Sequence, residues 1–469
     1  MTQRSIVRIE RSRRGLERLG CEIGGWLERR IADDAVGQYR TQLTTLRRVL
    51  DHALSGLGSR LDGVAGTDPV GSVYEGCSEI DGAAVWVRRV WEHYRERFDQ
   101  REDPRWATVL EAADEVVWSC YAEPMRIATG VGAAGGIGAA PLPFVDEVIA
   151  PAAALRQEPP RSLKLPRGVA AAVQEEMDAF LQSLPIPTVA LPPDCADEPW
   201  WLSVLGHEVG HTILADLSPQ AESEFGAALE AAALDAAAVE AGSGEGAWWR
   251  RWAHEVFADS FFVLTMGEAG VVAVEELETA SPESMAARRI RYPPATARLA
   301  LVRALAGRSD GAEAVAGSAA DSAPDDPSGP DVSAARRVAA AVLQAPLTGA
   351  AGPTDLETLA RCRQPELGDR LRSWVEGLRG RATLVPRRES RAARRVAGAG
   401  LLAWREVAGL ADVGERAEAR SALSEALLDC LPRCREGGVR AAGTVPAVET
   451  EALGHNLTRL GLRHARPGP

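Results

Sequence analysis

The feature that most constrains the fold is the stretch 201–212, because it contains His207-Glu208-Val209-Gly210-His211. On an α-helix, residues four apart share one face and are separated by about 6 Å along the axis. His207 and His211 would therefore project side by side, close enough to hold one metal ion between them. Glu208 directly follows His207 and can reach a water molecule bound to that ion. The chain has seven histidines, so composition alone predicts on the order of 0.01 such motifs.

A catalytic zinc ion takes three protein ligands and keeps one position open for water, so a third ligand is needed. A histidine six residues after His211 would supply it, but that position is Leu217. The stretch 252–262 offers a carboxylate instead, with Glu255 and Asp259 four residues apart on one helical face. Large apolar side chains flank this pair and predict a buried helix, in which two carboxylates are costly unless they are compensated. A metal ion and its histidines would compensate them.

The two stretches together resemble the gluzincin, or thermolysin-like, zinc metallopeptidases. Those proteins carry His-Glu-x-x-His on one helix and Glu-x-x-x-Asp on a later one. The resemblance covers residues 201–262 and implies a zincin-like core and a zinc-dependent hydrolase that cleaves peptide bonds. It also implies a role for each matched residue: His207, His211 and Glu255 as zinc ligands, Glu208 as general base, Asp259 as the partner that orients His207, and His254 as a residue that can orient His211.

Two features depart from that family. Forty-three residues separate His211 from Glu255, so the segment 220–246 would be an insertion. The residue that stabilises the negatively charged oxygen of the transition state also has no sure counterpart. Tyr292 is the candidate we choose for this catalytic role, with the neighbouring Arg291 and Arg289 as alternatives, and packing of the turn as the alternative role for Tyr292.

The charge pattern limits the possible partners. The net charge is −13, which argues against nucleic acid as the main partner. Residues 194–285 hold eighteen Asp and Glu residues against two Arg, which favours basic ligands or a divalent cation, unless these acids only form solvated helix faces. A peptide or protein substrate is therefore expected. Oligomeric state is not predicted.

Membrane insertion is not expected, because no segment reaches the ~18 consecutive apolar residues that a membrane-spanning helix needs. The N-terminus has basic residues but no apolar run behind them. The seven cysteines are scattered and odd in number, so they suggest no disulfide framework. These observations predict a soluble, cytoplasmic protein.

The fold is expected to be mainly α, with at most a small β-sheet, because apolar residues recur at three- and four-residue steps along much of the chain. Leucines from Leu43 to Leu61 form one such stripe, which predicts core packing rather than a dimerisation coil. The segment 186–192 predicts a short edge strand, because prolines bound it. The expected regions are an N-terminal helical region (1–126), a Gly/Pro-rich loop (127–166), the zincin-like catalytic core (167–306), a disordered linker (307–335) and a C-terminal helical region (336–469).

Two other functions remain open. The first is a catalytically silent scaffold or binding protein, in which a structural zinc ion only ties two helices together. The second is a zinc amidohydrolase that acts on a non-peptide amide, which the motif cannot distinguish from a peptidase.

Overall fold

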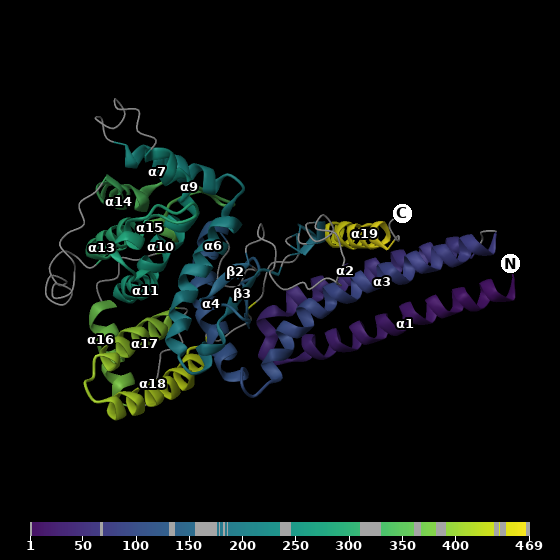
Figure 1. Cartoon of the computed structure of the whole chain (residues 1–469), viewed down its shortest axis with the longest axis horizontal. Coiled ribbons are helices and arrows are strands. Elements are labelled where there is room, and N and C mark those ends of the chain that lie inside the picture. Colours follow the sequence, from purple (N-terminus) through teal and green to yellow (C-terminus); the bar gives the residue numbers. More distant parts are fainter. Residues whose placement is uncertain are drawn as a thin grey trace.

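Helices make up most of the molecule, as the sequence predicts, and small β-sheets accompany them. The structure is a computed structural model. It describes residues 2–65, 69–130, 137–154, 176–177, 179–181, 183–184, 186–234, 245–309, 330–360, 367–380, 391–435, 440 and 447–465. The described helices form a broad body and an arm of long helices that projects from it (Figure 1). None of them is long and apolar enough to cross a membrane, and the cytoplasmic location stays a prediction.

Four helices form the arm, and their bounds are α1 (Gln3–Ala32), α2 (Arg40–Val64), α3 (Val70–Asp99) and α19 (Ala447–His464). The predicted leucine stripe is buried inside this arm, which confirms core packing. The C-terminal helix α19 lies against α2 and α3 rather than with the rest of the C-terminal region (Figure 1). A glycine permits this close contact, because a Cβ on Gly461 would lie 3.0 Å from the Cα of Ala83.

The remaining helices build the body around a second hydrophobic core. Their bounds are α4 (Ala107–Thr129), α6 (Leu205–Leu217), α7 (Ala221–Ala233), α9 (Glu245–Arg251), α10 (Ala253–Met266), α11 (Glu268–Glu278), α12 (Pro282–Ala286), α13 (Ala295–Ser309), α14 (Pro330–Ala341), α15 (Leu356–Ala360), α16 (Leu367–Arg379), α17 (Ala392–Ala408) and α18 (Val413–Arg433). Short 3-10 helices lie at Asp34–Tyr39, Gln100–Glu102, Pro193–Ala196, Pro199–Val204 and Val342–Gln344.

The two hydrophobic cores do not follow the predicted region boundaries. Helix α4 lies within the predicted N-terminal region, yet its apolar residues from Val109 to Ala128 belong to the core of the body. Helix α14 starts inside the predicted linker, at Pro330, and α13 continues to Ser309. The rest of that linker, 310–329, lies outside the described residues.

A three-stranded sheet of β1 (Leu142–Val145), β2 (Ala152–Ala154) and β3 (Thr188–Leu191) contacts α4 and α6. The predicted strand is confirmed as β3, but its edge position is wrong. It is central, parallel to β1 and antiparallel to β2. Pro187 and Pro192 lie just outside the paired residues, so they do not interrupt the ladder.

The segment 127–166 is also not wholly loop, since β1 and β2 lie within it. Its residues 131–136 and 155–166 are outside the described part of the chain. A hairpin of β4 (Leu347–Gly349) and β5 (Gly352–Thr354) interrupts the otherwise helical C-terminal region.

Candidate metal centre

Helices α6 and α10 carry the residues predicted to bind metal, and the two helices pack directly against each other. Helix α6 begins at Leu205 and ends at Leu217, two residues before Pro219, and α10 spans Ala253–Met266, so both predicted helices are confirmed. A Cβ on Gly210 would lie only 3.0 Å from the Cα of Ala258. Glycine therefore permits the close helix contact that places the side chains of α6 opposite those of α10.

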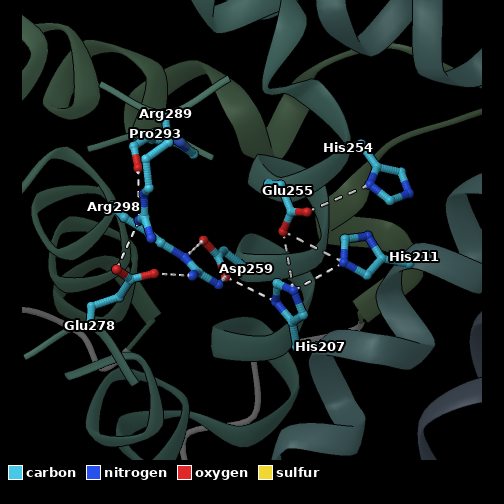
Figure 2. A network of polar contacts seen from close by, with 9 residues as sticks. All are labelled: His207, His211, His254, Glu255, Asp259, Glu278, Arg289, Pro293 and Arg298. Atoms are coloured by element: carbon cyan, nitrogen blue, oxygen red, sulfur yellow. Dashed lines mark hydrogen bonds and ion pairs between the residues drawn. The ribbon is translucent and has the colours of Figure 1, made fainter. Parts of the chain in front are cut away.

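His207, His211 and Glu255 converge at one point between these helices (Figure 2). The Nε2 atoms of the two histidines are 3.0 Å apart. Oε2 of Glu255 lies 3.4 Å from Nε2 of His207 and 3.6 Å from Nε2 of His211. All three residues are buried, with 5–7% of their surface exposed. The structure therefore brings together the three predicted ligands as a group that could hold a metal ion.

The two distances to Oε2 of Glu255 fit a tetrahedral ion, whereas the 3.0 Å between the two Nε2 atoms is shorter than such an ion would set. Zinc binds histidine nitrogen and carboxylate oxygen at about 2.0–2.2 Å, which places neighbouring ligand atoms of a tetrahedron about 3.3–3.6 Å apart. The chemistry of the donors fits as well. Oε2 of Glu255 is buried and accepts no hydrogen bond, and a buried carboxylate oxygen in this state needs a compensating positive charge. An ion between the three ligand atoms would supply it.

The protonation of the two histidines differs because their neighbours differ. Burial by itself lowers the pKa of His207, but Asp259 and Glu255 reverse this effect and raise it to about 10. Burial lowers the pKa of His211 well below its ordinary value, and repulsion from His254 and His207 lowers it further. The neighbouring carboxylates therefore favour the charged form of His207, whereas the neighbouring histidines favour the neutral form of His211. Metal binding requires both imidazoles to be neutral, so a metal ion would compete with a proton on His207.

Asp259 supports His207 from the side opposite the ligand cluster. Its Oδ1 lies 2.9 Å from Nδ1 of His207, so the other ring nitrogen, Nε2, faces the cluster (Figure 2). Burial raises the pKa of Asp259, but the guanidinium of Arg298 outweighs this effect and holds the pKa well below its usual range. Asp259 thus lies beside His207, as predicted, and its carboxylate pairs with His207 on one side and with Arg298 on the other.

Arg298 on α13 links Asp259 to a second buried carboxylate, so that acidic and basic side chains alternate along one hydrogen-bonded network. Its Nε and Nη2 donate to the two oxygens of Asp259 at 2.6 and 2.7 Å, and its Nη1 donates to Glu278 at 2.5 Å. Glu278 also accepts a hydrogen bond from Arg289 at 2.8 Å. The side chains of Arg298, Asp259 and Glu278 are all less than 10% exposed. The network therefore fixes Asp259, and through it the ring of His207.

Arg298 is not among the residues predicted from the sequence, although its position in α13 carries a signal. Arg298 lies on the same face of α13 as Leu301, Val302 and Leu305, which are fully buried. An arginine in the middle of an apolar helix face needs a buried anionic partner. The pattern could have predicted that such a partner exists, but not that it is Asp259.

Replacing Arg298 with methionine is expected to destabilise the protein by about 3–5 kcal/mol, because it leaves two buried carboxylates without their shared cation. Arg303→Met is the matched control, since Arg303 lies on the same helix but pairs with Glu275 at the surface. That variant is expected to cost less than about 1 kcal/mol. Urea unfolding monitored by circular dichroism measures both. Equal losses in the two variants would contradict the role given to Arg298.

Tyr292, the predicted catalytic residue, lies beside this network. Its ring faces the guanidinium groups of Arg289 and Arg298 at 5.3 and 5.6 Å from the ring centroid. These contacts match the alternative role, in which Tyr292 packs the turn before α13. Glu208, the predicted base, is buried on the first turn of α6 and is close enough to His207 to favour its charged form.

No protein-family model matches this chain, and no match was found among curated proteins or solved structures. The resemblance to gluzincins therefore rests on the residues of α6 and α10 alone.

Proposed function

We propose that the protein is a zinc-dependent hydrolase, and that its reaction is the cleavage of peptide bonds. The observation that carries this proposal is the position of Oε2 of Glu255, which faces the Nε2 atoms of both His207 and His211 at 3.4 and 3.6 Å. Two imidazoles and one carboxylate are the ligand set of thermolysin-type catalytic zinc, which leaves the fourth position for water.

Each residue of the cluster has a distinct role in this proposal. His207, His211 and Glu255 would hold the ion, which would supply an acidified water and a positive charge that polarises the substrate carbonyl. Glu208 accepts a proton from the attacking water and returns it to the leaving amine. Asp259 and Arg298 keep the ring of His207 in its binding orientation. The oxyanion-stabilising role of Tyr292 stays a prediction.

The acidic composition of residues 194–285 supports a basic peptide or protein as substrate. A non-peptide amide is the alternative that the same cluster would also accept. A purified sample incubated with casein and a peptide library distinguishes them. We expect peptide cleavage that stops when a zinc chelator is added and returns when zinc is restored. Cleavage that continues after complete metal removal would contradict the proposal.

One observation favours a second candidate, the catalytically silent zinc protein. The three predicted ligands are buried and lie on two helices that pack against each other, so that a structural zinc ion would join the two helices. In that case zinc raises the melting temperature, but none of the peptides, proteins or amides tested is hydrolysed.

A further inference from the structure

Two cysteines lie one helical turn apart at the end of α18, and both are free thiols. Cys430 is in the last turn of the helix, and Cys434 directly follows its last residue, Arg433. Side chains four residues apart share one face of a helix. The Sγ of Cys434 is 3.5 Å from the carbonyl oxygen of Cys430, so this side chain folds back over the turn that carries the first cysteine.

The two thiols differ in how readily each loses its proton. A hydrogen bond between them lowers the pKa of Cys430, with burial acting in the opposite direction and the charge of Arg433 in the same direction. The same hydrogen bond raises the pKa of Cys434, and burial and the charge of Glu115 raise it further. The thiolate therefore forms first at Cys430, while Cys434 keeps its proton beside it.

A bond between the two sulfurs needs only a small movement of the helix end. Cβ atoms four residues apart on a helix are separated by about 5–6 Å, and a disulfide needs about 3.5–4.5 Å. Pro432 lies between the two cysteines and has no N–H to donate to the preceding turn. Cys434 lies just outside the helix, so its backbone can approach Cys430 while the preceding turns keep their hydrogen bonds.

We propose that Cys430 and Cys434 form an oxidation site, at which a hydroperoxide converts the two thiols into a disulfide. Their side chains belong to residues that are only 3% and 2% exposed, which favours an oxidant as small as hydrogen peroxide over a bulky disulfide compound. The site is separate from the predicted metal ligands and does not depend on the proposed hydrolysis.

The reaction has two steps, and both are balanced. The thiolate of Cys430 attacks one oxygen of the peroxide and becomes a sulfenic acid, while the O–O bond breaks and the other oxygen leaves as hydroxide, which takes up a proton. The sulfur of Cys434 then attacks the sulfenic sulfur. The S–S bond forms, the S–O bond breaks, and a second water molecule leaves. The two sulfurs thus supply the two electrons that reduce the peroxide.

Peroxide treatment of the folded, full-length chain tests this site. The protein is treated with hydrogen peroxide, its remaining thiols are alkylated, and it is digested with trypsin. Trypsin cuts after Arg433, between the two cysteines, so the disulfide would join two separate peptides. We expect mass spectrometry to find this joined pair, and dithiothreitol to restore both thiols. Burial raises the pKa of Cys120 to about 12, so this buried cysteine should keep its thiol.

Two serine variants test the order of the two steps. In Cys434→Ser the hydroxyl can still donate to Cys430, so a sulfenic acid should accumulate at Cys430 and be trapped by dimedone. In Cys430→Ser the labelling of Cys434 should be lower by at least about tenfold, because a cysteine reacts as its thiolate. Circular dichroism shows whether both variants are folded.

Three results would overturn the inference. Both cysteines could still be alkylated after peroxide treatment of wild type, which would show that the pair does not react. Dimedone could label the two variants equally, which would remove the distinction between the two thiols. Oxidation of the pair that dithiothreitol does not reverse would show that no disulfide forms. The first and third results come from wild type alone and hold even if a variant fails to fold.

Discussion

Replacing Glu208 with glutamine is expected to abolish hydrolysis while the zinc content stays at the wild-type level. Glutamine has nearly the same shape as glutamate, but its amide cannot accept the proton of the attacking water. A general base contributes about 10²- to 10⁴-fold to a rate, so kcat should fall by at least that factor. Metal content should not change, because the predicted ligands are His207, His211 and Glu255. The measurement is kcat on a cleaved peptide, together with zinc per chain.

Glu222→Gln is the matched control for this variant. Glu222 is exposed on α7, the next helix along the chain, and the substitution removes the same charge. This control should hydrolyse the peptide at the wild-type rate. Hydrolysis by Glu208→Gln at a rate near that of the control would contradict the role of Glu208 as base, even if zinc were present.

Replacing His211 with alanine is expected to remove the bound zinc. Two protein ligands would remain, and the buried carboxylate of Glu255 would lose part of its compensation. Loss of a residue that only supports a ligand costs roughly 10- to 100-fold in metal affinity, so loss of a ligand should cost at least about 100-fold. Zinc per chain after dialysis, and the dissociation constant from competition with a chelator, measure this effect.

His455→Ala controls for the loss of a histidine as such. His455 is exposed on α19 in the arm, and its removal should leave the zinc content unchanged. Zinc bound equally by His211→Ala and His455→Ala would end the assignment of His211 as a ligand.

The local part of this site could be predicted because it depends on helical periodicity alone. His207 and His211 are four residues apart, as are Glu255 and Asp259, and this spacing places each pair on one helix face. The structure brings the two faces together, with Asp259 at 2.9 Å from Nδ1 of His207. The prediction of each pair depends only on spacing within one helix, so the long segment between α6 and α10 does not affect it.

The parts that could not be predicted depend on contacts between distant segments. Arg298 reaches Asp259 from a helix thirty-nine residues further along the chain. Helix α19 packs on α2 and α3, which lie nearly four hundred residues earlier in the sequence. Periodicity shows which face of a helix is apolar, but not which distant helix covers it. For the same reason, the proline-bounded strand β3 could be located but not placed at the centre of its sheet.

We propose that one zinc ion is held by two histidines of α6 and one glutamate of α10. Anomalous X-ray diffraction from a crystal, recorded on both sides of the zinc absorption edge, tests it directly. We predict one strong anomalous peak that lies about 2.0–2.2 Å from Nε2 of His207, Nε2 of His211 and Oε2 of Glu255. A zinc-loaded crystal with no peak at this point, or with its only peak at other residues, would contradict the assignment of these three ligands.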